Sequence, residues 1–184
     1  MSARTMTGRL ARPPLLGTAL FIASESIFFL SIVAVYVALR PGGLPTAKAE
    51  LDVARTAVFS AFLFASSATM ALAERRRSRP WLVLTAALGA AFLAGQGLEY
   101  ARLLGGGIAS STGLFGTTFF TLTGLHGLHV IIGLAAIGGL AVASRRHGAL
   151  VRSVAWEGVA WYWHFVDAVW IVVFSVVYLG TLLA

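Results

Sequence analysis

The feature that most constrains this chain is its alternation of long apolar runs with short segments that hold most of its charges. Hydrophobic residues make up 58% of the sequence and charged residues 11%, whereas a soluble domain carries about 25% charged residues. A transmembrane helix needs about 20 mostly apolar residues, and the sequence offers five such runs. We therefore predict an all-α integral membrane bundle of five transmembrane helices, forming a single domain over residues 1–184.

Proline, glycine and charged residues set the expected limits of the helices. The first helix should end before Pro41-Gly42-Gly43, because this sequence favours a turn. Pro80 suits the first turn of a helix, and the glycine-rich stretch 105–111 is typical of a loop. The five helices are expected at about residues 15–39, 52–73, 80–104, 113–143 and 156–183.

The basic residues predict how the chain threads through the membrane. Ten of the fourteen lysines and arginines fall on one side when five helices alternate in direction. Cytoplasmic loops are enriched in lysine and arginine, so we predict a cytoplasmic N-terminus and a C-terminus on the outside. The ten residues are Arg4, Arg9, Arg12, Arg75, Arg76, Arg77, Arg79, Arg145, Arg146 and Arg152.

Composition also excludes several function classes. The net charge of +7 comes from loop arginines rather than from one basic face, so nucleic-acid binding is not expected. The chain has no cysteine, which excludes disulfides, thiolate metal sites and haem attachment through a CxxCH motif. The apolar run after the N-terminal arginines is too long for a cleavable signal peptide, and we expect none.

Five polar residues lie in the middle of the predicted spans, where an unpaired charge or imidazole is costly. Glu25 is about 15 Å into the first helix. Its carboxyl is either a proton-exchanging or lipid-facing group, or an acid that is hydrogen-bonded to a neighbouring helix. The others are two pairs, His126 with His129 and His164 with Asp167, and each pair has the i, i+3 spacing of one helix face.

Two interpretations of these histidines stay open. Histidines and carboxylates on facing helices can bind a metal or a haem iron, and they can also form hydrogen bonds that fix the helices against each other. Di-metal bundles use several inward glutamates, whereas only Glu25 and Asp167 lie at this depth. We favour a structural polar network, with no metal and no catalytic residue on this chain.

Two further groups are expected near the ends of the helices. Glu99, with Gln96 one turn before it, lies near the outer end of the third helix and can pair with Arg102 at i, i+3. We include Glu99 in the structural polar network. Trp161, Tyr162 and Trp163 gather toward the inner end of the fifth helix, where we expect an aromatic belt at the membrane interface.

Four sequence blocks resemble subunit III of the haem-copper oxidases, the family of the cytochrome c and quinol oxidases. The blocks are LFIASESIFF, GQGLEYARLL, GTTFFTLTGLHGLHVIIGL and WYWHFVDAVWIVVFSVVYL. They occur in the order found in the family and cover most of the chain from Leu16 to Leu179.

The resemblance implies an accessory subunit III of a bacterial terminal oxidase, in the cytoplasmic (inner) membrane. The chain would pack directly against subunit I, in a complex with subunit II, other oxidase subunits and membrane lipids. Haem and copper are expected on partner subunits and none on this chain. It would support aerobic electron transport and oxygen reduction by aiding proton uptake and the stability of subunit I, without being an enzyme by itself.

The resemblance also assigns residues. Glu25 corresponds to the carbodiimide-reactive carboxylate of the family, and the histidines, Asp167 and Trp161 to packing and hydrogen-bonding positions. Larger members have seven helices, with a lipid-filled cleft between the first two and the remaining five. The first helix of this chain corresponds to their third, so the cleft is expected to be absent or walled by partner helices. Bound phospholipid is one option.

Two alternatives remain for the function. A related short protein accompanies some nitric oxide reductases, and this chain could have that partner instead. A stand-alone membrane metalloprotein would use the mid-membrane histidines and carboxylates itself. The electron donor of the oxidase, cytochrome c or quinol, stays open because its site would lie on other subunits.

Overall fold

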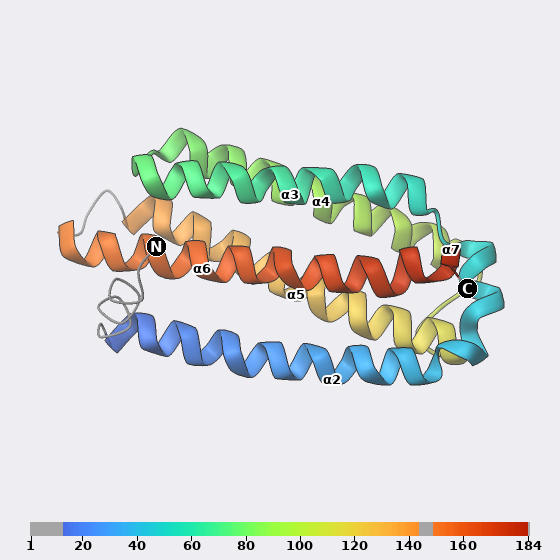
Figure 1. Cartoon of the computed structure of the whole chain (residues 1–184). Coiled ribbons are helices and arrows are strands. Elements are labelled where there is room, and N and C mark those ends of the chain that lie inside the picture. The colour runs from blue at the N-terminus through green and yellow to red at the C-terminus, as the bar shows by residue number, and fades with distance from the viewer. Residues whose placement is uncertain (1–12, 144–148, 184) are drawn as a thin grey trace.

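The computed structural model describes residues 13–143 and 149–183, and these residues form helices with no β-strand among them (Figure 1). The predicted inner-side residues Arg4, Arg9, Arg12, Arg145 and Arg146 lie outside the described residues. The elements are α2 (Pro13–Glu50), α3 (Val53–Arg76), α4 (Arg79–Gly105), α5 (Gly113–Ala143), α6 (Ala149–Phe174), the π-helical turn η1 (Ser175–Leu179) and α7 (Gly180–Leu183).

Five of the helical stretches are long and apolar enough to cross a membrane, with mean hydropathies of 1.6 to 2.1. α6, η1 and α7 together make the fifth span. The prediction of an all-α bundle with five transmembrane helices is therefore confirmed. α2 begins at one end of the bundle and α7 ends at the other (Figure 1), as an odd number of spans requires.

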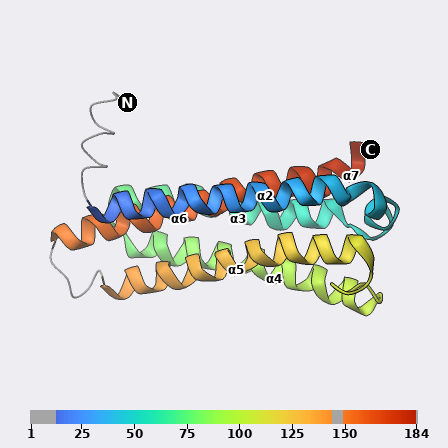
Figure 2. The same cartoon turned by 90° about the horizontal axis from the view of Figure 1, so that it is seen from below.

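The helices form two layers. α2, α6 and α3 lie in one layer, and α5 and α4 lie in the other (Figure 2). α6 is the central helix of the three-helix layer, and it packs against α2 on one side, α3 on the other and α5 beneath it. The opposite side of α6 therefore faces away from the bundle.

α2 extends further than its sequence predicts. We expected an end near Leu39, but the helix continues to Glu50 with Pro41 and Pro45 inside it. Proline lacks an N–H and clashes with the preceding turn, so it kinks a helix that continues beyond it. In Figure 1 the last part of α2 accordingly turns across the end of the bundle.

Close packing holds this bent segment in place. A Cβ at Gly43 would lie 3.1 Å from the backbone nitrogen of Phe115, at the start of α5. The guanidinium of Arg40 donates a hydrogen bond to the carbonyl oxygen of Gly180 at the start of α7. The residues predicted to form a turn thus join α2 to two other elements at this end.

The interior is filled by large aromatic side chains. Trp163, Trp170, Phe92 and Phe119 are fully buried. The ring of Trp163 lies between α4 and α5, where a Cβ at Gly89 or at Gly133 would come within 2.8 Å of it. Because lipid gives helices no hydrophobic reason to associate, such close packing is a main source of bundle stability.

Candidate functional site

One polar contact between predicted mid-membrane residues joins α2 to α5. Nε2 of His129 lies 3.2 Å from Oε2 of Glu25. The Glu25 side chain is 22% exposed and that of His129 is 10% exposed. The structure thus provides a hydrogen bond from Glu25 to a neighbouring helix, which was one of the two alternatives for this acid.

The surroundings of His129 determine its protonation pattern. Nδ1 lies 2.8 Å from the carbonyl oxygen of Leu125. A carbonyl oxygen only accepts hydrogen bonds, so Nδ1 carries a hydrogen and donates it. The contact between Nε2 and Glu25 then needs one shared proton, held either as a neutral imidazole with a carboxylic acid or as an imidazolium with a carboxylate. Both forms have zero net charge, which suits the middle of a membrane.

Two aromatic residues fix the orientation of this pair. The hydroxyl of Tyr162 donates to the backbone carbonyl of His129 over 3.1 Å. The ring of Phe29 meets the imidazole edge-on, with 4.9 Å between the ring centroids. The pair is therefore held by α2, α5 and α6 together.

His126 has a different environment, although it is only three residues from His129. It is 1% exposed, and its ring stacks on Trp170 of α6 with a centroid distance of 4.8 Å. Phe92 of α4 meets it edge-on. Neither ring nitrogen of His126 has a hydrogen-bond partner among the described residues. The two histidines therefore face different helices.

The second predicted pair lies between α6 and α3. Nδ1 of His164 is 2.7 Å from the hydroxyl oxygen of Ser67. Asp167 is 4% exposed, and its carboxyl lies beside the hydroxyl of the same Ser67. His164 is partly exposed on the bundle surface. This group is separate from the pair formed by Glu25 and His129.

The histidines do not converge on one point. His129 faces α2, His126 faces α6 and α4, and His164 faces α3. Among the described residues, no three histidine, aspartate or glutamate side chains are close enough to hold a metal ion. The arrangement is that of interhelical contacts.

A third polar group lies where α4 and α2 end. The guanidinium of Arg102 lies 2.8 Å from Oε1 of Glu99, the i, i+3 contact that the sequence suggested. The same guanidinium donates to the carbonyl oxygen of Glu50 at the end of α2. The Glu99 side chain is 2% exposed. Arg102 thus neutralises a buried acid and links α4 to α2.

The three aromatic residues of the predicted belt have different positions. Trp163 is fully buried, Tyr162 is 7% exposed, and Trp161 is only partly buried. Tyr162 and Trp163 thus point into the bundle, because their polar atoms bond to groups on α5 and α3. A membrane-surface belt does not describe these two side chains.

Sequence reasoning missed a pair of tryptophan–serine hydrogen bonds between α6 and α3. Nε1 of Trp163 donates to the hydroxyl of Ser66 over 3.0 Å, and Nε1 of Trp170 donates to the hydroxyl of Ser60 over 2.8 Å. The spacing of these residues in the sequence could have predicted the hydrogen bonds, because the tryptophans are seven residues apart and the serines six. That places both donors and both acceptors about two turns apart on facing helices.

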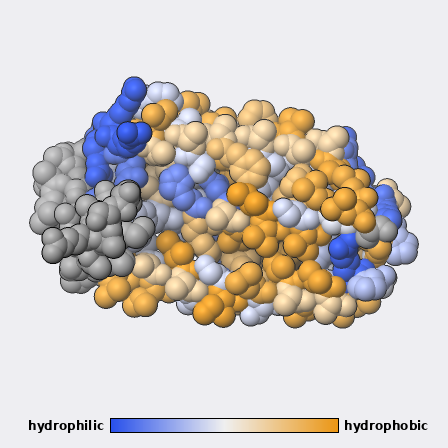
Figure 3. Space-filling model, viewed as in Figure 1, coloured by the Kyte–Doolittle hydropathy of each residue, from blue (hydrophilic) through white to orange (hydrophobic). Residues whose placement is uncertain are grey.

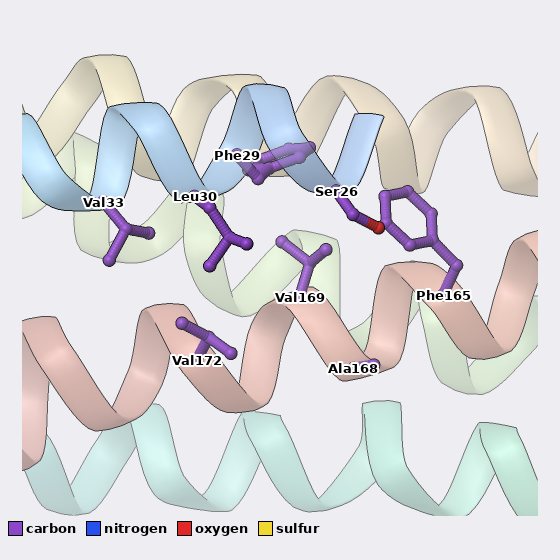
Figure 4. A pocket seen from close by; sticks show the side chains of 8 residues that line it. All are labelled: Ser26, Phe29, Leu30, Val33, Phe165, Ala168, Val169 and Val172. Atoms are coloured by element: carbon purple, nitrogen blue, oxygen red, sulfur yellow. The ribbon is translucent and has the colours of Figure 1, made fainter. Parts of the chain in front are cut away.

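An apolar groove of about 190 Å³ opens between α2 and α6, on the outward side of the three-helix layer (Figure 4). Leu30 of α2 and Val169 of α6 point into the space between the helices in Figure 4. Ser26 is the one residue with a polar side chain among those that line it, and its hydroxyl bonds to the carbonyl of Ile22. The lining residues are Ser26, Phe29, Leu30, Val33, Phe165, Ala168, Val169 and Val172.

Comparisons with known proteins agree on one family. The family model described as cytochrome c oxidase subunit III matches residues 59–181. A cytochrome c oxidase subunit 3 from Synechocystis sp. is 39% identical over 175 residues, covering 89% of this chain and 74% of the relative. The probable subunit 3 of Nocardia farcinica is 36% identical, with coverages of 88% and 85%. The subunit 3 of Corynebacterium diphtheriae is 34% identical, with coverages of 97% and 94%.

Proposed function

This chain belongs to the cytochrome c oxidase subunit III family, and we propose that it packs directly against the haem- and copper-bearing subunit I of a bacterial oxidase. Its function is that of an accessory subunit of a haem-copper oxidase. The comparisons do not support the nitric oxide reductase alternative or the stand-alone metalloprotein.

The proposed contribution of this chain is to stabilise subunit I and to hold one exchangeable proton at its flank. The proposal of an exchangeable proton rests on the contact between Glu25 and His129, which needs one shared proton at mid-membrane depth. Glu25 keeps 22% of its side chain exposed, so it can exchange that proton with a neighbouring group. Oxygen reduction itself would take place at haem and copper on the partner subunits.

The proposed location is the bacterial cytoplasmic membrane, with the N-terminus in the cytoplasm. Five span-length helices and the distribution of arginines support this orientation. In this orientation Glu25 lies ten residues, or about 15 Å, from Leu15, where the first span begins on the cytoplasmic side. That depth is about half of a hydrocarbon core of ~30 Å, so a proton from the cytoplasm would cross half of the membrane to reach the pair.

The first test is purification of the tagged chain from native membranes in a mild detergent. We expect a haem absorption spectrum that changes on reduction, and mass spectrometry should identify oxidase subunits I and II. A haem-free preparation without subunit I would overturn the proposed function.

A second experiment tests the role of the Glu25 pair within the purified oxidase. Glu25→Ala removes the shared proton, and we expect slower proton uptake or faster inactivation during turnover. Glu25→Gln is the matched control for structure, because the amide can still donate to Nε2 of His129. If both variants keep the proton uptake rate and turnover lifetime of the unmodified oxidase, the pair has no role in proton supply.

A further inference from the structure

The outward side of α6 combines the groove with an exposed polar group. The surface of the three-helix layer is mostly hydrophobic, but hydrophilic atoms interrupt it over α6 (Figure 3). His164 and its partner Ser67 are both partly exposed on this side. Ala168 is exposed one turn further along α6 and also lines the groove.

Depth makes the exposed histidine difficult to reconcile with a lipid environment. His164 is ten residues from Val154, where the span begins, or about 15 Å along the helix. Acyl chains offer no hydrogen bond, and polar residues at this depth almost always face protein or a water-filled cavity. The one hydrogen bond of His164 to described residues uses Nδ1, so Nε2 is available to a further partner.

The shape of this side also suits a helix. Ala168 of α6 and Ser175, the first residue of η1, are exposed and seven residues apart along the fifth span, so they lie on one face. Small residues allow the backbone of a second helix to approach closely. The groove beside them can receive one apolar side chain, since its lining is apolar apart from the Ser26 hydroxyl.

We propose that the outward face of α6, between α2 and α3, binds a transmembrane helix of another subunit of the same oxidase. That helix places an aliphatic or aromatic side chain in the groove and a hydrogen-bonding side chain opposite Nε2 of His164. The inference rests on the proposed function, since it requires the chain to be part of an oxidase. It adds the surface that binds the partner and the chemistry that the partner must present.

Photocrosslinking in the complete complex tests this surface. Benzoylphenylalanine is placed at Ala168 of the tagged chain in cells, and the complex is purified after illumination. We expect an adduct with a transmembrane segment of an identified oxidase subunit. Leu98 of α4 is 57% exposed and belongs to the other layer, so the same probe there controls for non-specific adducts.

The outcomes separate this inference from the function on which it rests. Adducts from Ala168 with lipid alone, or with proteins outside the oxidase, in a complex that contains haem would overturn the docking surface and leave the proposed function intact. A tagged chain that carries no haem and no subunit I would overturn the proposed function, and the docking surface with it.

A substitution at His164 tests the polar half of the contact. In His164→Leu we expect the crosslink yield from Ala168 to fall about threefold to tenfold, the range for loss of one interhelical hydrogen bond. His164→Gln should keep the yield, because its amide can still bond. Ser31→Ala is the control, since the Ser31 hydroxyl is exposed but bonds to its own helix. An unchanged yield in His164→Leu would show that His164 makes no contact with the partner.

Discussion

Two histidines three residues apart show how strongly a single position determines the effect of a polar group in this bundle. His129 uses both ring nitrogens, one for the carbonyl of Leu125 and one for Glu25. His126 uses neither nitrogen for a described residue and contributes through its ring, stacked on Trp170. The first side chain therefore acts through hydrogen bonds and the second through shape.

Replacement by phenylalanine should therefore lower the stability of the complex at His129 but not at His126. His129→Phe leaves Glu25 without its partner, and we expect destabilisation by about 1–3 kcal/mol. His126→Phe keeps an aromatic ring against Trp170 and removes two polar atoms, so we expect a neutral or stabilising effect. The measurement is the temperature at which half of the chain dissociates from the purified complex. Equal losses in the two variants would contradict this distinction.

At the scale of helices, glycine positions determine how closely α4 and α5 approach α6. Gly89 and Gly133 make room for the Trp163 ring, whose indole N–H is satisfied by Ser66. The ring thus contacts α4 and α5 while it hydrogen-bonds to α3. One side chain of α6 accordingly sets the spacing of three other helices.

Gly89→Ala should disturb this packing. The new Cβ would lie 2.7 Å from the Trp163 ring, and overpacking of this kind costs about 1–3 kcal/mol. Gly97→Ala on the same helix is the control, because a Cβ there meets nothing within 4 Å; it should be neutral or stabilise by up to about 1 kcal/mol. We expect the dissociation temperature of the complex to fall by at least about 2 °C in Gly89→Ala alone. A similar fall in both variants would mean that the contact with the Trp163 ring is not the cause of the loss.

The ion pair at the end of α4 should matter more than the one at the start of α3. Arg102→Ala leaves the buried carboxyl of Glu99 unpaired and removes the link to Glu50. Loss of such a partner costs about 1–3 kcal/mol. Arg55 pairs with Asp52 at 3.4 Å, but their side chains are 47% and 36% exposed, and exposed pairs contribute about 0–1 kcal/mol.

The same thermal dissociation experiment compares Arg102→Ala with Arg55→Ala. We expect a clear decrease in dissociation temperature for the first variant and little change for the second. If Arg55→Ala has the larger effect, burial does not determine the strength of these pairs.

For the whole molecule, hydropathy predicted the number of spans, because lipid requires each crossing to be long and apolar. The partners of the polar side chains were not predictable in the same way. Three residues turn a helix by about 300°, so His126 and His129 point about 60° apart, enough to face different helices. Which helix each one meets depends on packing that only the assembled bundle defines. The extension of α2 through Pro41 has the same origin, since contacts with Phe115 and Gly180 hold the bent segment.

The predicted orientation of the whole chain depends on the arginine distribution, and the loops allow a direct test. The sequence has no cysteine, so single replacements give an unambiguous signal. Ser78 lies between α3 and α4, and Ser110 lies between α4 and α5 at the other end of the bundle.

With the N-terminus in the cytoplasm, Ser110→Cys should react in intact cells with a maleimide that cannot cross the membrane, and Ser78→Cys should react only after the cells are opened. The positive-inside rule requires this result, because Arg75, Arg76 and Arg79 flank Ser78 and no lysine or arginine lies within five residues of Ser110. The reverse labelling pattern would invert the bundle. Leu15, where the first span begins, would then lie at the outer surface, and the proposed cytoplasmic location of the N-terminus would be wrong.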